Sequence, residues 1–183
     1  MKTLFTIHAG EFLVGSKIEQ QIKGINIWLP AKDKGVDLLV TNSQNRCLVS
    51  LQVKFSRDFL VTHMESMFQE GLLACGWWTH SRKKIRASKA NLWVFVLQAF
   101  DPQKTQFILI PPQELDRRLS RIHGTKDRVQ SYLWVTEKLK CWETRGLPKR
   151  DQILIANNAY VSEGRDFTQY LNAWRNLEHR LKK

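Results

Sequence analysis

The sequence lacks the features that would place it in a membrane or hold it together with disulfides. It has three cysteines, Cys47, Cys75 and Cys141, and they lie too far apart in the chain for the close spacing of a zinc site or a redox motif. They are typical of ordinary thiols in a reducing compartment. No apolar run approaches the roughly 20 residues of a membrane span, and His8 and Glu11 interrupt the apolar start too early for a signal sequence. We therefore expect a cytoplasmic protein without a membrane partner.

Acidic residues are also scarce. The chain has 29 Lys and Arg against 17 Asp and Glu, which gives a formal net charge of +12. A basic excess of this size attracts polyanions, and nucleic acid is the commonest such partner of a soluble protein. The same excess could instead serve only solubility. The sequence has no phosphate-cradling loop of the nucleotide-binding kind, so ATP and NAD are not expected cofactors.

Hydrophobic periodicity predicts the secondary structure of most of the chain. Helical spacing is found at Glu11 to Ile22, Met64 to Trp78, Gln113 to Ile122 and Tyr170 to Leu181, and strand patterns are found at Ile25 to Leu29, Val36 to Thr41, Leu48 to Phe55, Leu92 to Ala99 and Phe107 to Ile110. Residues 123–165 give no clear pattern. This order predicts an α/β (α+β) fold with a mixed central sheet of about five strands flanked by helices. We expect residues 1–112 to form this core, and residues 113–183 to add a helical C-terminal extension packed on the same domain.

Three polar residues stand at the ends of otherwise apolar strands. Asp37 opens one strand, and Gln52 and Lys54 close the next. Because strand side chains alternate, Gln52 and Lys54 point to the same face of the sheet. If the two strands pair as a hairpin, Asp37 lies opposite the end that carries Gln52 and Lys54. The sequence therefore predicts that the three side chains converge at one end of the sheet.

This grouping suits metal-dependent phosphodiester hydrolysis. Asp37 supplies the anionic oxygen that a hard divalent ion needs, the Gln52 amide oxygen is a neutral ligand, and Lys54 can stabilise charge on phosphorus. Glu11, at the start of the first helix, is a further carboxylate ligand within expected reach. We predict Mg²⁺ or Mn²⁺ as the cofactor. Each residue also has a purely structural interpretation: Gln52 and Lys54 as the polar half of a strand, Asp37 as a turn residue, and Glu11 as an acid at a helix N-terminus.

The order of these residues resembles the PD-(D/E)xK nuclease superfamily, which has the restriction-endonuclease-like fold. The resemblance lies in Glu11, in Gly35-Val36-Asp37-Leu38-Leu39-Val40 and in Leu51-Gln52-Val53-Lys54. Archaeal Holliday-junction resolvases look similar in this core, as does a bacterial group of nuclease-like proteins over His8 to Lys54 and Asn91 to Pro112. The resemblance implies a Mg²⁺-dependent endonuclease that acts on DNA in restriction, repair or defence. It also implies Glu11, Asp37, Gln52 and Lys54 as catalytic residues, with a homodimer as one expected assembly. The chain departs from the family pattern at Gln52, where an acidic residue is usual, although some members look alike in having Gln there.

A basic segment follows the predicted core helix, and it is the candidate nucleic-acid-binding surface. It contains Arg82, Lys83, Lys84, Arg86 and Lys89, which could follow a phosphate backbone. A solvated loop or helix face is the alternative for this segment. Two other functions remain open for the chain as a whole. One is a nuclease-fold protein that binds nucleic acid without cleaving it, which the amide of Gln52 favours, and the other is a protein-interaction role.

Overall fold

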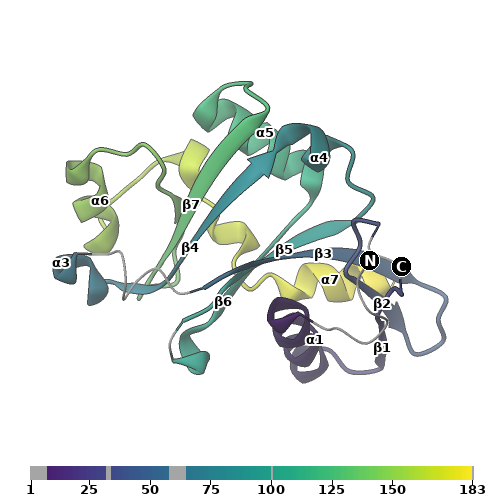
Figure 1. The fold of residues 1–183 in the computed structure, drawn as a ribbon. Helices are drawn as coiled ribbons and strands as arrows, with labels where there is room; N and C mark the ends of the chain where they lie inside the picture. Colours follow the sequence, from purple (N-terminus) through teal and green to yellow (C-terminus); the bar gives the residue numbers. More distant parts are fainter. Residues whose placement is uncertain (1–7, 32–33, 58–64, 100, 183) are drawn as a thin grey trace.

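Two β-sheets organise the chain in the computed structural model, which describes residues 8–31, 34–57, 65–99 and 101–182 (Figure 1). The larger sheet has five strands in the order β1-β2-β3-β5-β6, and the smaller has three in the order β4-β7-β8. The strands of the larger sheet are β1 (Ile25–Trp28), β2 (Leu38–Asn42), β3 (Leu48–Ser56), β5 (Leu92–Leu97) and β6 (Gln106–Ile110). Strands β3 and β5 run parallel and the other neighbours run antiparallel, so the sheet is mixed as the sequence predicts.

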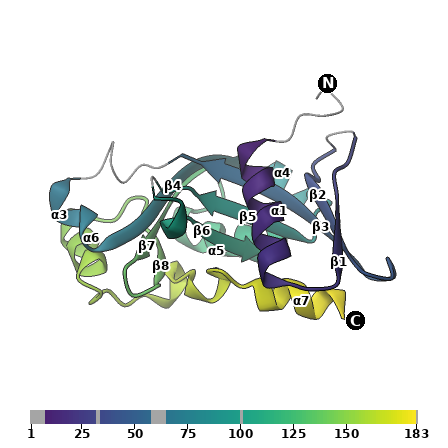
Figure 2. The same ribbon diagram turned by 90° about the horizontal axis from the view of Figure 1, so that it is seen from below.

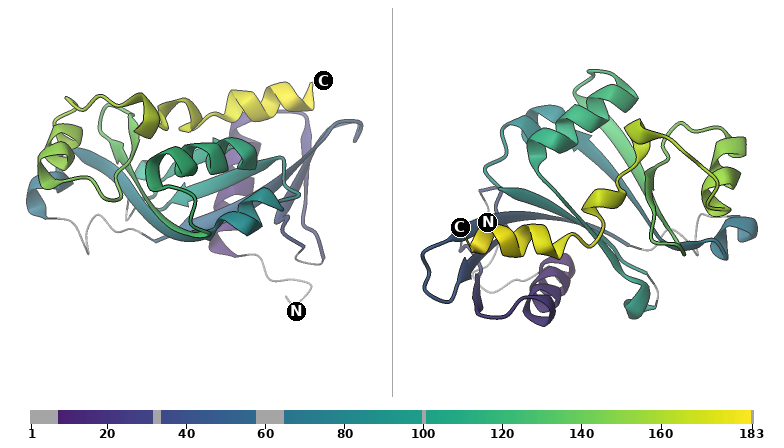
Figure 3. Two further views of the ribbon diagram at one scale, coloured as in Figure 1. Left: turned by 90° about the horizontal axis from the view of Figure 1, so that it is seen from above. Right: turned by 180° about the vertical axis from the view of Figure 1, so that it is seen from behind.

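Helices α1 (Ala9–Gln21) and α7 (Trp174–Leu181) cover one face of the five-stranded sheet. Figure 2 shows α1 crossing this face, and Figure 3 shows α7 beside it. Their apolar side chains form one core with alternate residues of the central strands, among them Leu51 of β3 and Val94 of β5. A second core lies on the other face, where Trp93 and Phe95 of β5 pack against the smaller sheet. The continuous apolar character of β5 therefore reflects burial on both faces.

The smaller sheet corrects the prediction of a helix from Met64 to Trp78. Met64 lies outside the described residues. Of the described part of that range, α3 (Ser66–Gln69) is helical, and β4 (Leu72–Ser81) pairs antiparallel with β7 (Arg128–Thr136). A Cβ on Gly76 would collide with the ring of Trp78, so this close approach requires glycine. Aromatic residues and glycine at this point disfavour a helix. The partner strand β7 falls in the segment whose sequence pattern gave no prediction.

The C-terminal part contains more than the predicted helices. Helix α5 (Pro112–His123) and α7 agree with the prediction, and α6 (Lys149–Ala156) is an additional helix. Strand β7 and the short β8 (Cys141–Glu143) lie between α5 and α6. Because β7 pairs with β4, residues on both sides of position 112 share one sheet. The space between the two sheets is where the candidate site lies.

Single-turn elements complete the described chain. They are α4 (Arg82–Arg86) and the 3-10 turns Pro102–Lys104, Glu163–Arg165 and Thr168–Tyr170. Within the described residues, no helix has both the length and the apolar character needed to cross a bilayer.

Candidate functional site

Asp37 lies next to the strand segment that carries Gln52 and Lys54. Its backbone N–H donates to the carbonyl of Leu51 (2.8 Å), and its Oδ2 accepts a hydrogen bond from the backbone N–H of Val53 (2.7 Å). Strand β2 begins only at Leu38. The carboxylate of Asp37 therefore accepts the hydrogen bond that a further residue of β2 would otherwise accept. Val53 stands between Gln52 and Lys54, so the structure confirms that Asp37 and this segment lie together.

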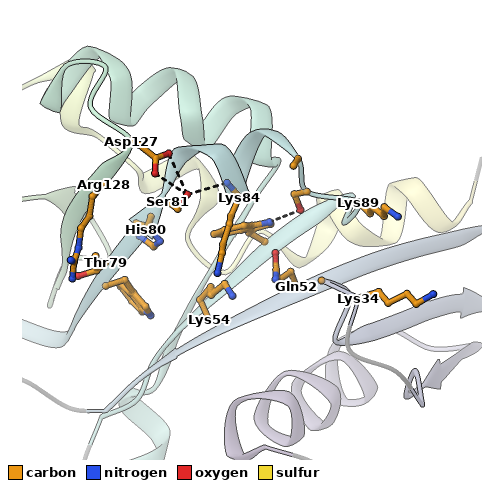
Figure 4. A pocket seen from close by; sticks show the side chains of 15 residues that line it. Lys34, Gln52, Lys54, Thr79, His80, Ser81, Lys84, Lys89, Asp127 and Arg128 are labelled. Atoms are coloured by element: carbon orange, nitrogen blue, oxygen red, sulfur yellow. Dashed lines mark hydrogen bonds between the residues drawn. The ribbon is translucent and has the colours of Figure 1, made fainter. Parts of the chain in front are cut away.

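Gln52 and Lys54 line a cavity of about 790 Å³ between the two sheets. They share a face of β3, and the neighbouring residues Leu51 and Val53 pack into the core on the opposite face. The register with β5 places Gln52 beside Trp93, whose indole also lines the cavity. Figure 4 shows the Gln52 and Lys54 side chains on the β3 side, below those of β4 and α4.

The lining of this cavity is strongly basic. Among the described lining residues, five side chains are cationic and one, Asp127, is a carboxylate; the cations are Lys34, Lys54, Lys84, Lys89 and Arg128. Asp127 is engaged by α4, since it accepts hydrogen bonds from the Ser81 hydroxyl (3.2 and 3.3 Å) and from the backbone N–H of Lys83 (2.8 Å). The cavity therefore presents a positive potential that suits an anionic ligand.

The ammonium group of Lys54 lies near the Trp93 ring and the imidazole of His80. Its Nζ lies 5.1 Å from the centroid of the Trp93 ring, a cation–π distance. The Trp93 indole donates to the Ser88 hydroxyl (2.8 Å), which fixes the ring. Burial, and secondly the charge of Lys54, lowers the pKa of His80 from 6.5 to about 4. His80 is therefore neutral at pH 7, and its Nε2 lies 2.9 Å from the Ser131 hydroxyl.

Glu11 does not join this cavity in the described structure. It is buried in the first turn of α1, where its Oε2 accepts a hydrogen bond from the backbone N–H of His8 (3.3 Å). The adjacent Gly10 packs against β3 so closely that a Cβ there would lie 2.8 Å from Cβ of Phe55. Phe55 alternates with Lys54, so α1 meets β3 on the face opposite to the cavity. This geometry supports the structural interpretation of Glu11 as an acid that stabilises a helix N-terminus.

The predicted nucleic-acid-binding residues divide into three groups. Lys84 and Lys89 line the cavity, and Lys84 points from α4 toward β3 (Figure 4). Lys83 and Arg86 are exposed outside the described lining, and Arg86 pairs with Asp116 (2.8 Å). Arg82 is buried, which corrects the prediction that it is available to a phosphate backbone.

Arg82 instead connects α4 to α5. Its guanidinium pairs with Asp116 (3.0 Å) and donates to the Ser120 hydroxyl and to the Gly124 carbonyl (2.5 Å). The side chain is 1% exposed, so these partners replace the water that a guanidinium would otherwise bind. The sequence alone does not distinguish a buried Arg that joins two helices from an exposed Arg of the same basic run.

Gln52 lines the cavity and Asp37 lies outside its described lining, so together these two residues could hold only a partly hydrated divalent ion. No group of three or more His, Cys, Asp or Glu side chains gathers anywhere in the described part of the chain. Mg²⁺ usually keeps several waters and takes only one or two protein carboxylates. A carboxylate oxygen can accept a hydrogen bond and still bind a metal, since each oxygen has two lone pairs. Asp37 with the Gln52 amide oxygen is therefore an acceptable, weak donor set.

Sequence reasoning missed several residues of the cavity wall. Arg128 begins β7, and its segment showed no periodic pattern, while Lys34 stands in a turn. No other histidine stands at metal-ligand spacing from His80 in the sequence. Its place on β4 could have been found only by recognising that Trp77 to Ser81 alternates between exposed and buried residues as a strand does.

Comparison of the chain with protein-family models, with curated proteins and with solved structures finds no match. Only the residues of the cavity and their geometry therefore indicate what this protein does.

Proposed function

We propose that this protein is a metal-dependent nuclease that binds nucleic acid, most simply DNA, in the cavity between its two sheets. Asp37 and Gln52 would hold a Mg²⁺ or Mn²⁺ ion, and Lys54 would contact the scissile phosphate. One observation carries the proposal. The carboxylate of Asp37 bonds to the backbone between Gln52 and Lys54, while those two side chains face a cavity lined by four further cations.

The basic lining supports binding of a phosphodiester backbone. Lys and Arg side chains that neutralise phosphates supply most of the sequence-independent affinity for nucleic acid. Lys34, Lys84, Lys89 and Arg128 come from different elements and converge on one cavity, so they can contact successive phosphates. If the basic excess served only solubility, we would not expect the positive side chains to concentrate around Gln52 and Lys54.

Each residue near the reacting phosphate has a separate role in the proposed reaction. A bound divalent ion would supply an activated water and polarise the phosphate. The hydrogen bond from the backbone N–H of Val53 orients the carboxylate of Asp37. Lys54, held over the Trp93 ring, places positive charge where negative charge develops on phosphorus. Neutral His80 adds no positive charge of its own beside Lys54.

The test is cleavage of supercoiled, single-stranded and branched DNA with Mg²⁺, Mn²⁺ or a chelator. Wild type is compared with Asp37→Asn and Lys54→Ala, and Lys23→Ala serves as a control that removes one exposed cation outside the cavity lining. We expect metal-dependent cleavage that both site variants lose by about 100-fold or more and that Lys23→Ala keeps. Cleavage that survives both site replacements would refute the proposed site.

A second candidate function is binding of nucleic acid without cleavage. The neutral amide of Gln52, in place of an acidic side chain, favours binding without cleavage, because a donor set with one carboxylate holds an ion only weakly. This function predicts salt-dependent binding to the same cavity with no metal-dependent product. Binding that Lys84→Ala and Lys89→Ala weaken, with no cleavage of any substrate, would select it over the nuclease. Absence of nucleic-acid binding at low salt would favour the protein-interaction role instead.

Assembly and location follow from the same proposal. Cleavage of both strands of a duplex needs two sites, so we propose a homodimer, which sedimentation analysis with and without DNA would test. We also propose a cytoplasmic location. Cys47, Cys75 and Cys141 form no disulfide in the structure, which supports this location because disulfides are rare in a reducing compartment.

A further inference from the structure

A second basic hollow lies next to the cavity, and the two share Arg128. This hollow has a volume of about 310 Å³ and is lined by His123, Lys126, Arg128, Val129, Gln130 and Arg145. Three of these side chains, Lys126, Arg128 and Arg145, carry permanent positive charge and are exposed. The described lining of the hollow contains no carboxylate.

The position of the hollow in the fold makes it a continuation of the cavity. On the cavity side, Ser81 of β4 pairs with Arg128 of β7. On the other side, the hollow is bounded by Gln130 of β7 and by Arg145, which follows β8. Arg128 therefore stands on the rim between the two depressions, at the end of the three-stranded sheet.

A buried carboxylate holds the far side of the hollow in place. Glu143 is fully buried, pairs with Arg165 (2.9 Å) and accepts hydrogen bonds from the backbone N–H groups of Tyr132 and Arg145 (both 3.1 Å). Nε2 of His123 lies 3.2 Å from the same carboxylate. Arg165 compensates the charge of Glu143, so the exposed cations determine the potential that an anion in the hollow meets.

We propose that a nucleic-acid strand bound in the cavity continues over Arg128 into this hollow, where Lys126 and Arg145 contact its phosphates. The inference rests on the proposed function and adds a substrate requirement to it. Crossing from β4 over β7 to β8 covers two strand spacings, about 10 Å. At the 3.4 Å per nucleotide that each strand of a stacked duplex has, this distance corresponds to about three nucleotides. Because Arg128 of β7 already lines the cavity, only the spacing from β7 to β8 lies past it, so substrates must extend about one or two nucleotides past the cavity to use the hollow.

The experiment measures binding of labelled single-stranded oligonucleotides of about 4 to 16 nucleotides, with chelator present so that nothing is cut. The double variant Lys126→Ala/Arg145→Ala is compared with wild type and with Lys23→Ala. For wild type, affinity should rise with length and then level off. The double variant should bind the shortest oligonucleotides as wild type does and the longest about tenfold more weakly. Its salt slope on the long oligonucleotides should be smaller by about 1.4, which corresponds to two lost phosphate contacts.

Two further variants separate charge from folding. Arg145→Lys keeps the positive charge and should keep the length dependence, while Lys126→Glu reverses one exposed charge and should weaken only long oligonucleotides. Thermal unfolding confirms that each variant is folded. Equal affinity of wild type and the double variant at every length overturns the inference while leaving the proposed function intact. An equal loss at every length overturns it as well, because the hollow would then not be a separate extension. If wild type binds no oligonucleotide, the proposed function itself fails.

Discussion

The backbone N–H of Val53 donates a hydrogen bond to Oδ2 of Asp37 at 2.7 Å. The same carboxylate therefore extends the hydrogen bonding between β2 and β3 and is the proposed anionic ligand of the candidate metal site. The two roles can be separated by mutation. Asp37→Asn keeps an oxygen that can accept from Val53 but removes the charge, whereas Asp37→Ala removes both. We expect Asp37→Asn to retain near wild-type stability and to lose cleavage. Asp37→Ala should lose cleavage and also about 1–3 kcal/mol of stability, because the N–H of Val53 loses its partner.

Chemical denaturation with a cleavage assay on the same preparations checks this prediction. Ser43→Ala, an exposed change in the hairpin turn that follows β2, provides the control for handling and expression. If Asp37→Asn cleaves DNA as well as wild type does, the carboxylate of Asp37 has only the structural role.

Gln52→Glu should strengthen metal binding. The substitution introduces a carboxylate beside Asp37, and the affinity of oxygen-ligand sites rises with the number of charged ligands. We expect Mg²⁺ and Mn²⁺ to bind on the order of tenfold more tightly by calorimetry than to wild type. Gln44→Glu, which adds the same charge in the exposed β2–β3 turn, should leave the affinity unchanged. Equal gains in the two variants would mean that net charge alone is responsible, and that Gln52 does not face a metal site.

Arg82→Ala should destabilise the fold far more than Arg86→Ala, although both side chains pair with Asp116. Arg82 is 1% exposed and Arg86 is 58% exposed, so the two variants form a matched pair. Removing one partner of a buried ion pair costs about 3–5 kcal/mol, and removing an exposed pair costs about 0–1 kcal/mol. Urea denaturation with DNA binding at low salt would separate stability from affinity. A small effect of Arg82→Ala on stability, with a large loss of DNA affinity, would restore Arg82 to the binding surface.

The sequence predicted the part of the fold in which local pattern and burial agree. Strands β3 and β5 were found because alternating or continuous apolar residues match a sheet with one or two covered faces. Strand β4 was not found because apolar residues from Met64 to Cys75 also occur at helical spacing, and only the pairing with β7 decides between the two structures. Pairing between residues so distant in the chain is a tertiary effect that a short window of sequence does not contain.

The candidate site shows the same division. Asp37, Gln52 and Lys54 were predicted together because Asp37 directly precedes β2, the other two lie on β3, and a short hairpin joins these strands, so the local register brings them close. Arg128 and His80 belong to the same cavity through the β4–β7 pair, which was not predicted. Arg82 shows the reverse error, because its exposed neighbours in a basic run gave no indication of the partly buried Asp116 that pairs with it.

The buried imidazole of His80 should make stability depend on pH between about 4 and 6.5. Its pKa is about 4 in the folded protein and 6.5 as its ordinary value, since burial and then Lys54 oppose the charged form. In that window the unfolded chain binds more protons than the folded one, so the free energy of unfolding falls as the pH is lowered. A shift of this size corresponds to a loss of about 3 kcal/mol once the pH is below 4. His80→Gln, which has no titrating group, should show a flatter curve in this window.

Glu114 supplies the control for this prediction, because its titration falls at lower pH. Hydrogen bonds, first from Arg117 and then from Tyr170 and Arg118, lower its pKa from 4.5 to about 2 despite partial burial. The carboxylate therefore stabilises the fold above pH 4.5, and this contribution is lost as the pH falls toward 2. Urea denaturation at a series of pH values should show that Glu114→Gln keeps the loss between pH 6.5 and 4.5 and reduces the loss below it. If His80→Gln and wild type lose stability in parallel from pH 6.5 to 4.5, the imidazole of His80 is accessible to protons in the folded protein, and the closed packing of the cavity wall around Lys54 must be wrong.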